Sequence, residues 1–115
     1  MPDPSQLLIA RVHGVAARSA ELTAAAQELA DASGAQDGCL GFDVLAPPGV
    51  EAELVLVSRW RSDRDMRAHF ASGAYGRYVS AVTDLLTRPS DVTIHAVSST
   101  VHPLADLSIE PQRAS

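Results

Sequence analysis

The residues best suited to chemistry lie where an apolar strand runs straight into a short helix, between positions 54 and 70. The strand ends on the only tryptophan, Trp60, and the helix carries a histidine, His69, two turns further on. A flat indole and an imidazole can thus converge on one cavity, where an imidazole that titrates near neutral pH serves as a general base. We therefore take His69 as the candidate catalytic residue. The structural alternatives are a core anchor for Trp60 and a histidine bonded to a backbone group for His69.

Seven side chains around this segment share the expected cavity side and are the candidate substrate-binding residues. Two of them are tyrosines one turn apart on the next helical run, and their spacing also suits core or rim positions. Met66 and Phe70 are i, i+4 partners on the short helix that follows the strand, and their spacing suits the core or the cavity floor. The remaining three residues share one face of the strand, because side chains alternate between the two faces. The full set is Trp60, Phe70, Tyr75, Tyr78, Met66, Leu56 and Ser58.

Nothing in the sequence calls for a metal or an organic cofactor, so we expect neither. His13, His95 and His102 are dispersed and show no spacing typical of metal ligands. All basic residues are arginine, which leaves no lysine to form a Schiff base. The single cysteine, Cys39, is best interpreted as a buried structural thiol.

Composition restricts the possible partners. The 115 residues suit a single domain, with 46% hydrophobic and 20% charged residues. A net charge of −5 argues against nucleic acid, because phosphate binding needs a basic surface. No apolar run approaches the roughly 18 to 20 residues that cross a bilayer. The first residues lack the basic start of a signal peptide, so we expect a cytoplasmic protein with no membrane partner.

The apolar periodicity predicts strands, helices and their ends. We expect a helix over residues 19–33 that ends on a left-handed Gly34. A second helix should start at the N-cap Ser62, break at positions 72–73 and end before Pro89. The strands are expected over residues 7–13, 39–46, 53–61 and 92–98, and the second of these should carry Leu40, Phe42 and Val44 on one face.

The order β-α-β-β-α-β predicts an α+β, ferredoxin-like fold with a four-stranded antiparallel sheet. Helices would cover one face of that sheet only. The other face carries apolar side chains, so we expect a homodimer in which two sheets pair. The domain should span residues 6–100, with a disordered N-terminus over residues 1–5 and an extended or disordered tail over residues 101–115.

Several segments carry a resemblance to a known family. They are residues 7–12 (Leu-Leu-Ile-Ala-Arg-Val), 37–42 (Asp-Gly-Cys-Leu-Gly-Phe), 54–60 (Leu-Val-Leu-Val-Ser-Arg-Trp), 68–70 (Ala-His-Phe) and Tyr78. Together, over about residues 6–98, they resemble the antibiotic biosynthesis monooxygenase domain of the dimeric α+β barrel superfamily. The resemblance implies a dimer whose protomers each hold a cavity between helices and sheet. It also implies oxidation of anthrones or quinols by molecular oxygen without metal or flavin.

Some positions depart from the patterns of that family. Ser58 stands where a glutamate is often found, and Leu56 and Met66 stand where the oxygenase branch commonly has an asparagine and a tyrosine. The haem-degrading branch also pairs a strand tryptophan with a helix histidine. It uses a first-strand asparagine near Ala10, however, and this chain has no asparagine. Haem cleavage is therefore disfavoured.

Three functions follow from these observations. The favoured one is a cofactor-independent monooxygenase that acts on a phenolic polycycle or a quinol, with a small hydrophobic aromatic molecule and O2 as its partners. His69 would assist proton removal there. The alternative is a non-catalytic or accessory dimer that binds a hydrophobic small molecule or stabilises a partner enzyme. A haem-binding or haem-degrading protein is the least favoured.

Overall fold

Four segments alternate apolar and polar side chains with the two-residue period of a half-buried strand, and they form one sheet. The structure, a computed structural model, describes residues 3–106. Its strands pair antiparallel in the spatial order β2-β3-β1-β4. Their bounds are β1 Ser5–His13, β2 Cys39–Leu45, β3 Glu53–Trp60 and β4 Asp91–Val97.

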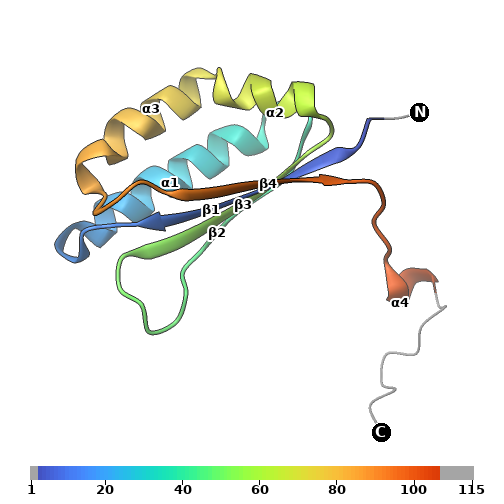
Figure 1. Ribbon diagram of the computed structural model, residues 1–115. Helices are drawn as coiled ribbons and strands as arrows, with labels where there is room; N and C mark the ends of the chain where they lie inside the picture. Colours follow the sequence, from blue (N-terminus) through green and yellow to red (C-terminus); the bar gives the residue numbers. More distant parts are fainter. Residues whose placement is uncertain (1–2, 107–115) are drawn as a thin grey trace, which may run out of the picture.

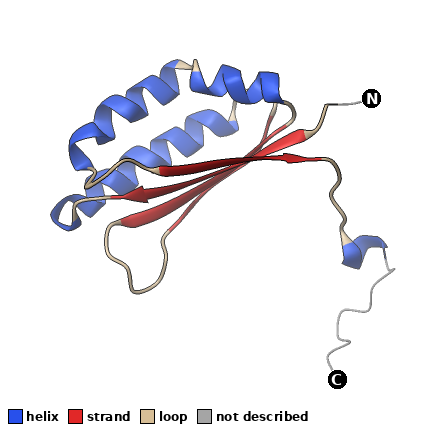
Figure 2. Cartoon of the chain, viewed as in Figure 1, coloured by secondary structure: helices blue, strands red, loops and turns tan. Residues whose placement is uncertain are grey.

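The three longer helices all lie on one face of this sheet (Figures 1 and 2). The predicted α+β, ferredoxin-like fold is confirmed, with the second helix of the β-α-β-β-α-β order in two pieces. After β4 the chain leaves the sheet and forms one further helical turn. The helices are α1 Ser19–Gly34, α2 Asp63–Phe70, α3 Gly73–Val82 and α4 Pro103–Asp106, with 3-10 turns at Ala16–Arg18 and Thr83–Leu85.

The core lies between α1 and the inner strands β1 and β3. Each fully buried leucine there contributes about 2 kcal/mol through the removal of its surface from water. The same cluster continues under α3 toward the 3-10 turn that precedes β4. Eight buried side chains make it up: Val12, Leu22, Ala26, Leu29, Leu54, Leu56, Val82 and Leu85.

Two capping serines set the path of the chain through α2 and α3. The Ser62 hydroxyl accepts a hydrogen bond from the Asp65 backbone N–H at 3.1 Å, as the sequence predicted. Ser72 caps α3 by accepting from the Tyr75 N–H at 3.2 Å. Ser72 also donates to the carbonyl oxygen of His69 at 2.6 Å. The break between the two helices is therefore fixed, and it brings His69 and Tyr75 together.

The end of α1 differs from the prediction. Gly34 is the last helical residue and is followed by Ala35 in the right-handed conformation, so it is not the left-handed residue. That role falls to Gly38, with a φ of 87°. The Gly38 carbonyl accepts the Arg61 backbone N–H at 2.8 Å, which ties the start of β2 to the end of β3.

Two strand details also differ. β1 begins at Ser5, two residues before the predicted start. The register between β2 and β3 shifts between Cys39 and Gly41, and this irregularity takes Leu40 out of alternation with Phe42. Leu40 is therefore half exposed, whereas we expected it on the same face as Phe42.

Residues 1–2 and 107–115 lie outside the described part of the chain, and the predictions for the two ends fall partly on them. Of the expected tail, the structure describes residues 101–106, which include α4. No helix within residues 3–106 is both long and apolar enough to cross a membrane.

The two glycines near the end of α1 allow a matched test of this account. A Cβ at Gly38 would need an unfavourable positive φ and would overlap the carboxyl group of Asp65. Gly38→Ala should thus lower the free energy of unfolding by about 2 kcal/mol. Gly34→Ala meets no atom within 4 Å and should leave that free energy unchanged or raise it by about 0.5 kcal/mol. Urea unfolding measures both, and equal effects would contradict the assignment.

Candidate functional site

A cavity lies between the sheet and the α2–α3 segment. It encloses about 70 Å³, or about 460 Å³ of atom-free space when its open mouth is included. The sheet side is lined from all four strands, by residues that include Leu8, Ala10, Phe42, Leu56, Ser58 and Val92. The helix side is lined by His69, Phe70, Tyr75, Tyr78 and, from α1, Leu29.

His69 is the histidine of this cavity, and it is 1% exposed. Its imidazole stacks on the indole of Trp60, with ring centroids 4.6 Å apart and planes 26° from parallel. Phe42 and Tyr75 contact the imidazole edge-on, at centroid distances of 5.9 and 5.3 Å. Aromatic rings therefore hold the imidazole from several sides.

Trp60 lies behind His69 instead of at the cavity wall. Its side chain is fully buried, and it is absent from the residues that line the cavity. The indole N–H donates to the Ser58 hydroxyl at 3.0 Å, so its one polar group is satisfied within the protein. A substrate in the cavity would meet His69, and Trp60 would support the imidazole from below.

Of the other predicted substrate-binding residues, five line the cavity and one does not. Leu56, Ser58, Phe70, Tyr75 and Tyr78 line the cavity, as expected. Met66 does not, since it is buried in the layer between α2 and the sheet. Strand alternation grouped Phe42 with Val44 on one face but did not identify Phe42 as a cavity residue, and the wall contributed by Val92 depends on how β4 pairs with β1.

Two polar partners of His69 were missed in the sequence. The Ser33 hydroxyl and the Gln36 side-chain oxygen each lie 3.4 Å from Nδ1 of His69. Ser33 falls on the buried stripe of α1 that also carries Leu22, Ala26 and Leu29. A serine at a core position of a helix was the available signal. Nε2 makes no hydrogen bond within the described residues, which leaves that nitrogen for a ligand.

Burial keeps the cavity free of charge at neutral pH. It lowers the pKa of His69 to about 4, and no charged side chain contributes to that shift. Burial also raises the pKa of Tyr78 to about 12, with a smaller contribution from Tyr75. The imidazole and the Tyr78 phenol are thus both neutral at pH 7.

Another histidine, His13, does not line this cavity. His13 is bracketed by two carboxylates, with Nδ1 3.2 Å from Glu53 and Nε2 2.9 Å from Asp91. These contacts join the ends of β1, β3 and β4. Across the part of the chain that is described, no three His, Cys, Asp or Glu side chains are grouped to hold a metal ion.

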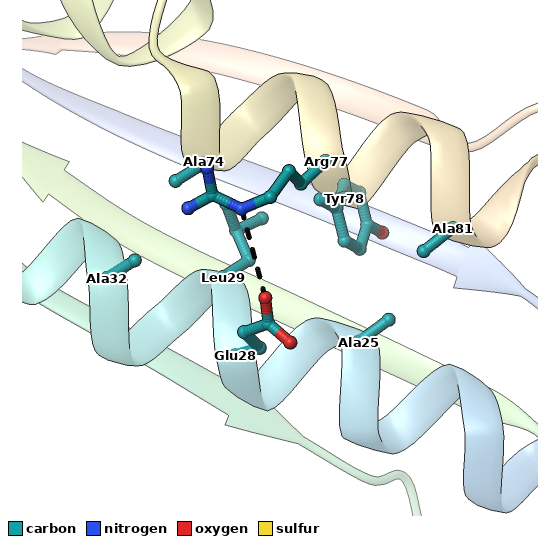
Figure 3. A pocket seen from close by; sticks show the side chains of 8 residues that line it. All are labelled: Ala25, Glu28, Leu29, Ala32, Ala74, Arg77, Tyr78 and Ala81. Atoms are coloured by element: carbon teal, nitrogen blue, oxygen red, sulfur yellow. Dashed lines mark ion pairs between the residues drawn. The ribbon is translucent and has the colours of Figure 1, made fainter.

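A second, smaller hollow of about 40 Å³ lies between α1 and α3 (Figure 3). Four alanines line it, and Arg77 reaches across it toward Glu28, at 3.9 Å between Nε and Oε1. Leu29 and Tyr78 line both this hollow and the cavity of His69. These two side chains therefore border both spaces.

With this geometry established, the family can be assigned. The family model described as antibiotic biosynthesis monooxygenase matches residues 6–81, which include β3, α2, all but the first residue of β1 and all the candidate residues. The chain belongs to that family. The resemblance of its sequence segments is thereby confirmed.

Similar proteins agree with the family assignment. A Mycobacterium tuberculosis protein named "putative monooxygenase Rv0793" is 42% identical over 62 residues, which are 54% of this chain and 60% of the relative. The sequence match thus spans less than two thirds of that relative. Its solved structure superimposes with a TM-score of 0.79 at 31% identity, over 85% of this chain and 99% of the other.

More distant structures share the fold. A "putative antibiotic biosynthesis monooxygenase" from Nitrosomonas europaea has a TM-score of 0.78 at 18% identity, over 82% of this chain and 99% of the other. One from Deinococcus radiodurans has a TM-score of 0.79 at 18% identity, over 84% of this chain and 96% of the other. At these identities the likeness establishes the architecture alone.

The buried imidazole has a consequence for stability. Unfolding restores the ordinary pKa of His69, near 6.5, so below that pH the unfolded chain binds a proton that the folded chain excludes. Stability should thus fall as the pH drops from 6.5 to 4, with roughly 3 kcal/mol lost through His69. Urea unfolding at several pH values measures this loss. His69→Phe should lose correspondingly less, and parallel curves for the two proteins would contradict the assignment.

Proposed function

We propose that this protein is a cofactor-independent monooxygenase that oxidises a phenolic aromatic or a quinol with O2. The observation that carries the proposal is His69, a neutral imidazole at the wall of an apolar cavity ringed by aromatic side chains. Membership of the antibiotic biosynthesis monooxygenase family supports the same reaction class. The relative named as a monooxygenase supports it as well.

Such a substrate supplies every electron that oxygen needs. A quinol and O2 give a hydroxyquinone and water: one oxygen atom forms a new C–O bond, and the other leaves as water with two hydrogens of the substrate. An anthrone similarly exchanges the two hydrogens of its CH2 group for a carbonyl oxygen. The protein has to bind the ring, accept a proton and keep bulk water away from the reactive anion.

The low pKa of His69 restricts how that proton moves. A phenol with a pKa near 10 is a weaker acid than the imidazolium by about six units, or about 8 kcal/mol, so full transfer before oxidation is unfavourable. Pairing of the imidazolium with the substrate anion reduces this difference. Loss of an electron also makes a phenol strongly acidic. We therefore expect the proton to move to Nε2 as the electron passes to oxygen.

The mouth of the cavity accommodates rings of different size. A space of about 70 Å³ is smaller than the roughly 150 Å³ that encloses a benzene molecule, so any ring must extend toward the opening. Val92 lines the cavity, and Ile94 follows it on the same face of β4; the two side chains are 52% and 49% exposed. A quinol would reach the mouth, and a polycycle would continue across these two side chains.

Turnover of a reduced quinone tests the function. The wild-type protein should consume oxygen faster than autoxidation of the same quinol. His69→Gln should lower kcat by about 10²- to 10⁴-fold, the usual contribution of a general base. Arg64→Gln, at an exposed position of the same helix that does not line the cavity, is the matched control and should retain full activity. An active His69→Gln protein would exclude the catalytic role of this residue.

The same experiment addresses the non-catalytic alternative. The hydroxyl of Ser58 is engaged by Trp60, and Ser33 and Gln36 face His69, so the cavity offers a ligand few free polar groups. An apolar cavity of this kind also suits a binding module. Wild-type oxygen consumption at the autoxidation rate, together with quenching of Trp60 fluorescence by a stable quinone, would favour binding without catalysis.

We further propose that the protein is a homodimer joined through the open face of its sheet. Helices α1, α2 and α3 cover the other face, as Figure 2 shows. The open face presents Leu7 and Ile9 of β1 beside Val55 and Val57 of β3, all half-buried in the single chain. An apolar sheet face needs a second layer, and a second copy of the same face supplies one.

Light scattering coupled to size-exclusion chromatography tests the dimer. Val57→Arg places a charge at the centre of the open face, where Val57 is paired with Ile9 and Asp43, and should yield a monomer. Val79→Arg introduces the same charge at an exposed position of α3 and should leave the dimer intact. Circular dichroism establishes that both variants are folded. A dimeric Val57→Arg protein would rule out this interface.

A further inference from the structure

Two polar side chains that sequence reasoning missed approach His69 from the same side. Ser33 is in the last turn of α1 and is 0% exposed. Burial of a hydroxyl is unfavourable unless it finds a partner, and among the described residues its partner is Nδ1 of His69. Gln36, just after the helix, reaches the same nitrogen with its side-chain oxygen. The contact therefore gives the buried Ser33 oxygen and Nδ1 of His69 a hydrogen-bond partner.

The backbone around Gln36 holds this side chain in place. The Gln36 N–H donates to the Ser33 carbonyl at 3.0 Å, and the Gln36 carbonyl accepts from the Cys39 N–H at 3.1 Å. The turn after α1 is thus closed on both sides of Gln36. Because Gly38 then joins Arg61 at the end of β3, this turn is tied to the strand that leads to His69.

We propose that Gln36 and Ser33 are positioning residues that hold His69 as the Nδ1–H tautomer, with an unprotonated Nε2 presented to the cavity. In the observed orientation of the Gln36 amide its oxygen faces Nδ1 and can only accept a hydrogen bond, so Nδ1 carries the hydrogen. The Ser33 hydroxyl oxygen can share the same hydrogen. A neutral imidazole carries one N–H, and Nε2 is then left with its lone pair.

The polar pair also decides between the two flips of the ring. The stack with Trp60 and the edge contacts with Phe42 and Tyr75 fix the plane of the imidazole. They would accept the ring equally well after a half-turn, which exchanges its nitrogens with its carbons. Only the observed flip lets Nδ1 meet Ser33 and Gln36. The aromatic contacts therefore set the plane, and the polar contacts set which atom faces the cavity.

A neutral partner suits an apolar cavity better than a carboxylate would. A carboxylate beside Nδ1 would favour the imidazolium and place charge in the site. The Gln36 amide orients the ring without adding charge. Among the aromatic rings that contact the imidazole, Tyr75 is the one with a titratable group. The kinetic consequence rests on the proposed function: a lone pair at Nε2 can accept the hydroxyl proton of a substrate, whereas an N–H there cannot.

Nitrogen NMR of the 15N-histidine-labelled protein tests the tautomer without any substrate. Near neutral pH, Nδ1 of His69 should show the shift of a protonated ring nitrogen, and Nε2 that of an unprotonated one. His69→Gln assigns the signals by their loss. A proton on Nε2 in the wild-type protein would overturn the proposal. This result does not depend on turnover, so failure of the proposed function would be recognised separately.

Variants of Gln36 test the positioning role. Gln36→Leu removes the acceptor and should give a mixture of tautomers. It should reduce kcat roughly tenfold, which is part of the 10²- to 10⁴-fold that a general base usually contributes. Gln36→Glu keeps an acceptor, should preserve the tautomer, and should raise the pH at which His69 titrates. Gln27→Leu, at an exposed position of α1, is the matched control and should change neither property. An unchanged tautomer in Gln36→Leu would show that Gln36 does not position the ring.

Discussion

The rest of the site depends on one contact, the stack of His69 on Trp60. Only two residues separate the end of β3 from the start of α2, so the tryptophan and the helix are held close together. An eight-residue helix has little stability of its own. Its buried side chains are Met66 and His69, so the imidazole contributes to the packing that keeps α2 in place. The residue best placed for chemistry is therefore also part of the core.

Periodicity and capping predicted the parts of the site that local rules control. Alternation along β3 placed Leu56, Ser58 and Trp60 on one face, and Ser62 marked the start of α2 correctly. The same alternation could not show that Trp60 lies beneath His69. That arrangement depends on the direction of α2 as it leaves the strand and on the bond between the indole and Ser58. A residue on the cavity side of a strand can still be covered by its neighbours.

Long-range contacts were the least predictable. Ser33 and Gln36 lie more than thirty residues before His69, and polar residues near a helix end usually suggest only a cap or a turn. The left-handed position was also misplaced, at Gly34 instead of Gly38. Helix-end rules favour the first glycine, whereas the hydrogen bond from Arg61 to the Gly38 carbonyl fixes the second. In each case a partner far along the chain decided the local geometry.

Tyr78 borders two spaces, the cavity of His69 and the hollow between α1 and α3. The size of this one side chain, with Leu29, decides where the cavity ends. A smaller residue at position 78 would widen both spaces, and position 78 is on a different helix from His69. The side chain that limits the cavity and the imidazole that lines it therefore lie on different helices, α3 and α2. A single substitution on α3 can therefore change the size of the cavity while the imidazole is retained.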